Sequence, residues 1–569
     1  MEQHHPWWHR TILYQIYPMS FQDTNADGIG DIPGITKRLD YIQSLGVNMI
    51  WLNPIFASPK VDHGYDVADY MEIDPQFGTM KDVEEFIREA HNRGIKIIFD
   101  LVLNHTSDQH PWFQEALKGK DNPYRNYYIW KDGKNGGTEP PNNWQGFFRS
   151  SVWEKEPNDD QYYFHLFAKE MPDLNWENPD VRRAMEDVAL FWMDKGIDGF
   201  RLDAFIHLHK EESFPDLDLP EGQIGIAEQY YANLPKVNQY MKIFTTDLRE
   251  HFPDVYILGE AASANVELAR SYCDPEQGGC DSVITFNYFT MDEDAKDPDL
   301  NGSMQKSNLL FDRFKANMDE WQQMMADVGG PVLYWNNHDM ARVVSRIGDD
   351  RIYRDNSAKM LATLMYLQKG IPLIYNGEEI GMKNLYIDRL EDFHAPEAAD
   401  FYEAALERGY TREWILYNMR ETSKDAARGG MQWDDSEFAG FSTVKPWSGV
   451  NVEHTYNVRD QVYDPNSVLI HYKKVLDLKR TDLFTYGEYR LLETEEHFYA
   501  YERELNNKVA TIICNVTDEV QTYQLDSVPD SAYRRPIVEN EGVRMIRDSV
   551  RLGPYGAIVL LTDYEEGEI

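Results

Sequence analysis

Short apolar runs alternate with longer amphipathic stretches along most of the chain. The runs are rich in Ile, Val, Leu and aromatic residues, and several of the intervening stretches end in glycine, as a capped helix does. Continuous apolar runs separated by helices are typical of strands buried on both faces of a parallel sheet. The eight runs lie at residues 12–18, 49–56, 95–105, 199–205, 255–261, 283–289, 332–339 and 371–380.

Eight strand–helix units close a (β/α)8 barrel, so the pattern predicts an α/β protein of this architecture. The interval between the third and fourth runs is long and rich in Trp, Tyr, Asn, Pro and Gly, which predicts a small subdomain over the barrel mouth. Beyond residue 484 the pattern alternates apolar and polar positions, as in an antiparallel β-sandwich. The predicted domains are a barrel (1–105 and 179–480), an inserted subdomain (106–178) and a C-terminal β-sandwich (484–569).

The overall charge limits the partners of the protein. There are 56 Lys and Arg against 97 Asp and Glu, a net charge of -41. Such a surface repels phosphate backbones and anionic membranes, so we expect neither nucleic acid nor a membrane as partner. The three cysteines are too few for a disulfide framework and lack the spacing of a zinc site. Cys273 and Cys280 could pair, but two ordinary thiols are favoured.

The location is predicted from what the chain lacks. The first ten residues contain no apolar segment typical of a signal peptide, and no run approaches about 18 apolar residues. We therefore expect a soluble, cytoplasmic protein. Its 35 tyrosines and 14 tryptophans are typical of sugar-binding surfaces, although a large core would use the same residues.

Polar residues end several of the otherwise apolar runs, and barrel active sites lie at these strand ends. A single carboxylate there is commonly a cap or an ion-pair partner, but several buried acids together are costly unless the chemistry needs them. Two close carboxyls, a third acid and aromatic walls are typical of glycoside hydrolysis. The terminal residues are Asp100, Asn104 and His105 on the third run, Arg201 and Asp203 on the fourth, Glu260 on the fifth, and Asn337, His338 and Asp339 on the seventh.

Four stretches resemble, in order and spacing, the signature regions of the alpha-amylase family of glycoside hydrolases. They are DLVLNH (100–105), GFRLDA (199–204), ILGEA (257–261) and WNNHD (335–339). Four further stretches are similar to the alpha-glucosidase and oligo-1,6-glucosidase branch, and the resemblance covers nearly the whole chain. They are GYDVADY (64–70), MPDLNWENP (171–179), GEEIGM (377–382) and ARGGMQWDD (427–435).

The resemblance implies a retaining mechanism with three catalytic carboxyls. Asp203 would be the nucleophile, Glu260 the general acid and base, and Asp339 a hydroxyl-binding acid. Retention requires Asp203 and Glu260 to lie about 5 to 5.5 Å apart. We expect Arg201 to keep Asp203 ionised, while neighbouring negative charge raises the pKa of Glu260.

The resemblance also implies the residues that bind the sugar, which we expect to be a small oligosaccharide. Asp100 is expected to orient Arg201 or His105, and Glu378 and Glu379 are expected to be structural. The implied substrate residues are His105 and His338 on ring hydroxyls, Asp62 and Arg428 on the far hydroxyls of a terminal glucose, Tyr65 as stacking platform, and Phe148 and Phe167 as walls, for which a packing role stays open.

Linkage preference rests on the residue after the nucleophile. Members that resemble alpha-1,6 enzymes carry Val there, whereas this chain has Ala204, which favours alpha-1,4 substrates such as maltose and maltooligosaccharides. Gly429–Gly430 and Met340 also depart from the branch. The alternatives are an oligo-1,6-glucosidase, or a glucosyl-transferring or isomerising relative such as trehalose synthase or sucrose isomerase. A non-enzymatic transporter subunit would need a membrane span and lost carboxylates, and the sequence has neither feature.

The stretch DTNADGIGD (23–31) places oxygen-bearing side chains at alternate positions before a glycine. An EF-hand starting at Asp23 would need Glu at its twelfth position, which is Gly34, so a calcium sensor is excluded. The family resemblance implies instead a structural Ca²⁺ loop, while a metal-free Asx-rich turn is the alternative. No organic cofactor is expected. The implied ligands are the side chains of Asp23, Asn25, Asp27 and Asp31 and the carbonyl of Ile29.

Overall fold

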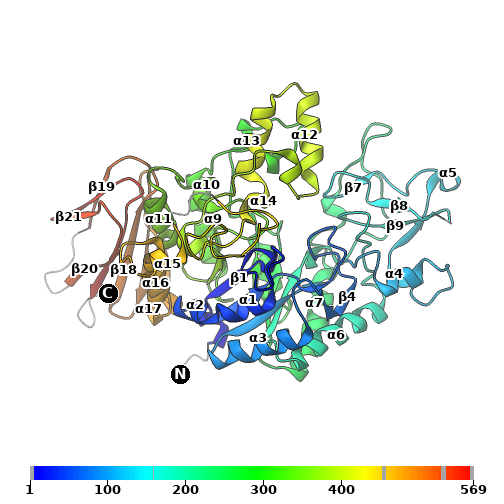
Figure 1. Cartoon of the computed structure of the whole chain (residues 1–569), viewed down its shortest axis with the longest axis horizontal. Coiled ribbons are helices and arrows are strands. Elements are labelled where there is room, and N and C mark those ends of the chain that lie inside the picture. The colour runs from blue at the N-terminus through cyan, green and yellow to red at the C-terminus, as the bar shows by residue number, and fades with distance from the viewer. Residues whose placement is uncertain (1–4, 158, 452–455, 527–532, 564–569) are drawn as a thin grey trace. The chain divides into compact units, whose positions relative to one another are not determined.

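The computed structural model describes residues 5–157, 159–451, 456–526 and 533–563. The chain divides into two compact units, and their helices and strands are labelled in Figure 1. The central unit comprises Trp51–His91 and Lys96–Asn287. The C-terminal unit comprises Met1–Ile50, Asn92–Ile95 and Tyr288–Ile569.

Four parallel strands form the main sheet of the central unit, in the order β13-β12-β10-β5. Nearly all of their residues are buried, as expected of parallel strands covered on both faces. The register places Arg201 of β10 beside Asp100 of β5 and makes the last residues of β10 and β12, Asp203 and Glu260, neighbours. The strands are β5 (Lys96–Val102), β10 (Gly199–Asp203), β12 (Tyr256–Glu260) and β13 (Ser282–Ile284), and the main helices are α3 (Met80–Asn92), α6 (Pro179–Asp194), α7 (Lys236–His251) and α8 (Val266–Cys273).

The start of α6 follows from its first residues. Asn178 accepts a hydrogen bond from the N–H of Asp180, and Pro179 occupies the first helical position, where its missing N–H has no cost. Val181, Met185 and Val188 then recur at helical spacing and are buried.

The residues between β5 and α6 form small sheets of their own within the central unit. An antiparallel sheet has the order β6-β9-β8, and β7 pairs with β11 from the loop after β10. The limits 106–178 for an inserted subdomain stay a prediction. The elements are α4 (Pro111–Ala116), β6 (Trp130–Asp132), α5 (Lys134–Gly137), β7 (Trp144–Gln145), β8 (Trp153–Lys155), β9 (Gln161–Phe164) and β11 (Gly225–Ile226), and β3 (Phe56–Ala57) pairs with β4 (Asp69–Ile73) before β5.

The C-terminal unit contributes three more parallel strands, in the order β1-β15-β14. The eighth strand, β2 (Met49–Leu52), spans the division between the units. Each of the eight predicted runs therefore overlaps one strand of this sheet, although the strand and its run differ in length. These elements are β1 (Leu13–Ile16), α1 (Ile32–Lys37), α2 (Leu39–Ser44), α9 (Phe311–Met324), β14 (Val332–Leu333), α10 (Val343–Arg346), α11 (Arg354–Tyr366), β15 (Ile371–Tyr375), α16 (Val468–Lys479) and α17 (Asp482–Tyr486).

The long segment after β15 carries short helices with an apolar cluster of their own, which includes Phe401, Ile415 and Met419. The chain then ends in two antiparallel sheets, as the alternation predicted. In Figure 1 the strand β18 lies near α11, which contacts it. The elements are α12 (Glu397–Glu407), α13 (Arg412–Thr422), α14 (Lys424–Ala427) and α15 (Val458–Gln461), the sheet β16 (Glu488–Leu491), β17 (Phe498–Leu505), β18 (Lys508–Asn515), β23 (Ala557–Asp563) and β20 (Tyr533–Glu539), and the sheet β19 (Gln521–Gln524), β22 (Ser549–Leu552) and β21 (Arg544–Ile546).

Cys273, Cys280 and Cys514 are buried free thiols, so the expected pair of ordinary thiols is confirmed. Among the described residues, no helix is both long and apolar enough to cross a membrane.

Candidate active site

One guanidinium gathers three carboxyls at the strand ends of the central unit. Arg201 Nη1 lies 2.5 Å from Asp100 Oδ1 and 2.7 Å from Asp203 Oδ1, and its Nη2 lies 2.9 Å from Glu260 Oε2. Residues 201 and 203 share a face of β10 because side chains alternate along a strand. The sheet register brings Asp100 and Glu260 to the same place from the neighbouring strands. The predicted grouping of Asp203, Glu260 and Arg201 is therefore observed.

Burial and the charge of Arg201 act in opposite directions on this cluster. Burial raises the pKa of Asp203 well above its ordinary value, and the positive charge of Arg201 opposes the effect. Burial likewise raises the pKa of Asp100 to about 6. Arg201 therefore acts on Asp203 in the expected sense, and the ionised state of Asp203 stays a prediction.

Asp100 has the orienting position that the sequence predicted. Its Oδ1 meets Arg201, and its Oδ2 accepts hydrogen bonds from Trp51 Nε1 at 2.9 Å and from the Tyr65 hydroxyl at 3.2 Å. The Tyr65 hydroxyl also accepts from Asn53 Nδ2 at 2.9 Å. Asp100 therefore fixes both the guanidinium and the predicted stacking platform.

His105, at the end of the same run as Asp100, is buried and neutral. Burial lowers its pKa to about 4, and its Nδ1 lies 3.3 Å from Asn104 Nδ2. Its Nε2 is buried and has no hydrogen-bond partner among the described residues. Asp62 acts on His105 electrostatically. An orphaned buried nitrogen marks a place where a ligand hydroxyl would satisfy it.

Aromatic rings continue outward from His105. The Phe167 ring lies 5.1 Å from the His105 ring and 6.1 Å from the Phe148 ring, centroid to centroid. Sequence reasoning missed Phe147, whose ring is 37% exposed and lies 5.4 Å from Phe167. Its neighbour Phe148 was chosen from the family motif, and no local pattern distinguished the two.

Asn104 joins His105 to a buried ion pair that the sequence analysis also missed. Lys210 Nζ lies 2.6 Å from Asp173 Oδ2 and 2.9 Å from Asn104 Oδ1. Both charged side chains are almost fully buried. A lysine three residues beyond the short helix Phe205–His207 was the only sequence signal.

The C-terminal unit gathers the remaining predicted residues. Arg428 Nε donates to the carbonyl of His338 at 2.9 Å, and its Nη2 lies 3.2 Å from Asp339 Oδ1. His338 Nε2 lies 3.2 Å from Asp339 Oδ2, and its Nδ1 is 2.9 Å from Gln15 Nε2. The Arg428 guanidinium lies 5.0 Å from the Tyr17 ring centroid. Gln15 and Tyr17 were missed, although a polar residue within an apolar run was a signal.

The buried acids Glu378 and Glu379 have satisfied oxygens, in line with the structural role expected of them. Glu379 Oε1 accepts from the hydroxyls of Tyr14 at 2.8 Å and Tyr41 at 2.7 Å. Glu378 accepts from Asn336 Nδ2 at 2.7 Å, and burial raises its pKa to about 7.

A family model for the alpha-amylase catalytic domain matches residues 15–487. The chain belongs to the alpha-amylase family. An oligo-1,6-glucosidase of Halalkalibacterium halodurans is 40% identical over 98% of this chain and 99% of the relative. A solved structure titled "Family GH13_31 enzyme" is 44% identical, with a TM-score of 0.88 over 98% of this chain and 100% of that one. The trehalose-6-phosphate hydrolase of Bacillus licheniformis is 38% identical, with a TM-score of 0.90 and the same coverage.

Membership of the alpha-amylase family confirms three predictions. The chain is a glycoside hydrolase, it fits the alpha-glucosidase and oligo-1,6-glucosidase branch, and its fold is the (β/α)8 barrel with a C-terminal antiparallel β domain. The roles of individual residues and the separation of Asp203 from Glu260 stay predictions.

Ala204 follows the candidate nucleophile in a strained backbone conformation. Its φ of 47° and ψ of 26° lie in the left-handed region, and its side chain is buried. Its N–H donates to Glu260 Oε2 at 3.1 Å. The carboxylate of Glu260 is thus held from two sides, by Arg201 and by this amide.

The donor set of the loop 23–31 fits a hard cation. Asp23 and Asp31 are buried; Asp23 Oδ2 accepts from the Ser442 hydroxyl at 2.6 Å, and Asp31 Oδ1 accepts from the N–H of Gly34 at 2.7 Å. Asp23 Oδ1 accepts the N–H of Asn25 at 3.0 Å, and Asn25 Oδ1 accepts that of Asp27 at 3.0 Å, so the loop winds around side-chain oxygens. Gly28 has a φ of +86°, and a Cβ there would lie 2.5 Å from the carbonyl oxygen of Lys445.

Proposed function

We propose that this protein is a retaining, exo-acting alpha-glucosidase that releases glucose from the non-reducing end of short alpha-glucosides. The proposal is carried by one observation: the carboxyls of Asp203 and Glu260 lie at the ends of neighbouring strands, and each contacts a different terminal nitrogen of the Arg201 guanidinium. Retaining glycosidases, which form a covalent intermediate, use two adjacent carboxyls of this kind.

In the proposed mechanism the Asp203 carboxylate attacks the anomeric carbon, and the acid form of Glu260 protonates the leaving oxygen. Glu260 then removes a proton from water, which attacks the glucosyl ester and releases Asp203. Arg201 shares its charge between both carboxyls and spreads the negative charge that moves between them. Asp203 has to be ionised when it attacks, and the charge of Arg201 favours that form. Every step uses side chains, so the mechanism needs no organic cofactor.

The proposed substrate contacts use polar groups that can still accept or donate hydrogen bonds in the folded chain. The Nε2 of neutral His105 would bind a ring hydroxyl. Asp339, held by Arg428 and His338, would bind hydroxyls of the same sugar ring more tightly in the distorted transition state. Asp62 and Arg428 would bind the far hydroxyls of the terminal glucose, and Tyr65 would stack beneath it. These contacts admit a chain end only.

We further propose a preference for alpha-1,4 over alpha-1,6 linkages, supported by Ala204. A small side chain beside Glu260 leaves room for the +1 sugar in the orientation of maltose. The second candidate is an oligo-1,6-glucosidase, favoured by the name of the 40% identical relative. Initial rates on maltose, isomaltose, sucrose, trehalose and trehalose 6-phosphate, with products resolved by chromatography, distinguish these functions. Isomaltose turnover well above that of maltose would contradict the alpha-1,4 preference, and transfer products in place of glucose would contradict hydrolysis.

Ala204→Val is expected to lower kcat/KM for maltose about tenfold and to raise the ratio of isomaltose to maltose hydrolysis. The added methyl groups fill space beside Glu260, and changes of this size in a pocket are worth about 1 to 3 kcal/mol. Because a β-branched residue is disfavoured at positive φ, the variant should also melt at a lower temperature. Ala204→Gly is the matched control, which relieves the backbone strain without filling the site. An unchanged substrate ratio in Ala204→Val would remove Ala204 as a determinant of linkage.

We propose that the loop 23–31 binds a structural Ca²⁺ through Asp23, Asn25, Asp27, Asp31 and the carbonyl of Ile29. Four oxygen-bearing side chains within nine residues, two of them buried carboxylates, support the proposal, because oxygen ligands of this kind suit Ca²⁺. The ion would stabilise the folded chain without contacting substrate. The expected cytoplasmic location stays a prediction.

Removal of calcium by a chelator is expected to lower the melting temperature before it lowers the rate at moderate temperature. Binding only to the folded state contributes about 2.7 kcal/mol when free calcium is about 100 times its Kd. Differential scanning fluorimetry with and without chelator measures the shift. The Asp27→Ala variant should have a lower melting temperature than the parent, and the chelator should not change it further. Asp40 is an exposed acid of the same unit, so the melting temperature of Asp40→Asn should respond to the chelator as that of the parent does. A melting temperature that the chelator leaves unchanged would contradict the metal site.

A further inference from the structure

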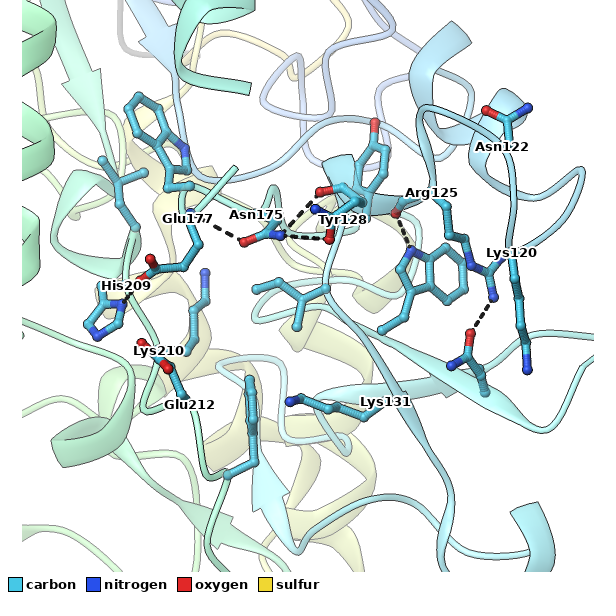
Figure 2. A pocket seen from close by; sticks show the side chains of 17 residues that line it. Lys120, Asn122, Arg125, Tyr128, Lys131, Asn175, Glu177, His209, Lys210 and Glu212 are labelled. Atoms are coloured by element: carbon cyan, nitrogen blue, oxygen red, sulfur yellow. Dashed lines mark hydrogen bonds and ion pairs between the residues drawn. The ribbon is translucent and has the colours of Figure 1, made fainter. Parts of the chain in front are cut away.

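A cavity of about 600 Å³ lies within the central unit, apart from the carboxyl cluster. Its walls come from the segments 120–131 and 175–177, the strand β9 and the loop after β10 (Figure 2). Its volume is in the range of small-molecule sites, about 300 to 1,000 Å³. None of the residues proposed to bind substrate or metal lines it.

One wall of the cavity carries three side chains with the geometry of metal ligands. Lys236 already binds the two carboxylates among them. Ligand atoms of Glu177, His209 and Glu212 lie within 4.8 Å of one another. Lys236 Nζ lies 2.8 Å from Glu177 Oε1 and 2.6 Å from Glu212 Oε1. The ammonium bridges both carboxylates, so a divalent ion would have to displace it. This wall therefore presents hydrogen-bonding oxygens and not a free anionic site.

Three of the four basic residues that line the cavity are paired with carboxylates. Lys120 lies 3.0 Å from Asp159, Arg125 lies 2.9 Å from Glu156, and buried Lys210 is paired with Asp173. Lys131 extends across the cavity in Figure 2, with its Nζ 4.8 Å from the Phe214 ring centroid. Three of the four cations that line the cavity and both of its carboxylates are thus in ion pairs, while Lys131 packs against Phe214. Because nearly all of these charges are already paired, neither an anion nor a metal is favoured as ligand.

The remaining surface is polar and uncharged, with apolar patches. Asn126 is exposed at the rim, and Ile129, Trp130 and Phe214 are partly exposed in the walls. Phe214 is held at a φ of 45°, which is rare for a bulky residue, and its ring centroid lies 5.3 Å from those of Trp144 and Trp153. Amides, salt-bridged carboxylates and an ammonium bind hydroxyl groups, while ring and aliphatic surfaces pack on C–H faces.

We infer that this cavity is a second binding site for a neutral saccharide of one or two rings. Glu177, Glu212, Asn126 and Lys131 would bond its hydroxyls, and Ile129 and Phe214 would pack against its C–H groups. The inference goes beyond the proposed hydrolytic reaction, because none of these side chains belongs to the carboxyl cluster. It rests on the cavity and its paired charges alone.

The test uses the full chain with its active site saturated by 1-deoxynojirimycin, an iminosugar mimic of glucose. D-glucose, inorganic phosphate and Zn²⁺ are then titrated separately, with saturation-transfer NMR for the sugar and calorimetry for the ions. We expect saturable glucose binding to the inhibited protein and none for phosphate or Zn²⁺. Absence of saturable glucose binding, or saturable binding of an ion that depends on Glu212, would overturn the assignment.

Variants connect that binding to the cavity. Ile129→Trp fills the space and should weaken glucose binding at least tenfold, and Glu212→Gln, at an exposed position, should weaken it several-fold. Glu221→Gln is the matched control, since Glu221 is exposed on the same loop but does not line the cavity. If Ile129→Trp does not fold, Glu212→Gln decides alone. Equal glucose affinity in the parent and in Glu212→Gln would contradict the site, as would equal loss in Glu221→Gln.

Discussion

Asp203→Asn is expected to lower kcat/KM for maltose by at least about 10⁴-fold, because an amide does not form the glucosyl ester. Glu260→Gln should be similarly inactive on maltose but should lose much less of the first step on p-nitrophenyl alpha-glucoside. That leaving group departs without a proton, so a burst of nitrophenol is expected before the slow hydrolysis of the intermediate. Rapid-quench and steady-state kinetics on both substrates separate the two roles.

The same substitution has an expected effect on stability that separates chemistry from folding. Burial raises the pKa of Asp203, so its ionised form is unfavourable beside Asp100 and Glu260. Removing that charge should leave the melting temperature unchanged or higher. Asp216→Asn, at an exposed carboxylate of the same unit, is the control and should keep full activity. Substantial residual activity in Asp203→Asn, or a burst in that variant, would remove Asp203 as the nucleophile.

Lys210→Met is expected to destabilise the protein by about 3 to 5 kcal/mol, the usual cost of leaving a buried charge unpaired. The substitution removes the ammonium from Asp173, whose side chain is fully buried 2.6 Å away. It also removes a bond to Asn104, which contacts His105, so a rise in KM should accompany the loss of stability. Chemical denaturation measures the first effect and steady-state kinetics the second.

Two comparisons make the Lys210 prediction specific to a buried charge. The double variant with Lys210→Met and Asp173→Asn should regain part of the stability, because the unpaired charge is gone. Lys134→Met breaks a pair with Asp216 in which both side chains are about half exposed, and should cost less than about 1 kcal/mol. Equal losses in Lys210→Met and Lys134→Met would show that burial of the pair contributes little.

Much of the fold was predictable because parallel strands enclosed on both faces leave continuous apolar runs. The run 199–205 contains β10, and its polar exceptions, Arg201 and Asp203, are the residues at the centre of the carboxyl cluster. The run 332–339 shows the limit of the method, since only Val332–Leu333 is a strand. The rest of that run is a loop that contains Asn337 and His338. Its hydrogen bonds are made by side chains and not by pairing of backbone groups with a neighbouring strand.

The chemistry of the site was predictable only in part. Motifs identified Asp203 and Glu260, but the raised pKa of Asp203 depends on how deeply three separate strands bury their carboxyls. The Lys210–Asp173 pair joins residues from two different loops, and neither has a local pattern that marks it. The saccharide cavity likewise arises from distant segments, so its ion pairs exist only in the folded chain.

The central claim, a retaining exo-acting alpha-glucosidase, is tested most directly by proton NMR of the first sugar released from maltotriitol. Its reducing end is blocked, so free anomeric signals arise only from bonds that the enzyme cleaves. We expect alpha-glucose and maltitol as the first products, with beta-glucose appearing later by mutarotation. Beta-glucose as the first product would contradict the covalent mechanism, and maltose with sorbitol would contradict attack at the non-reducing end.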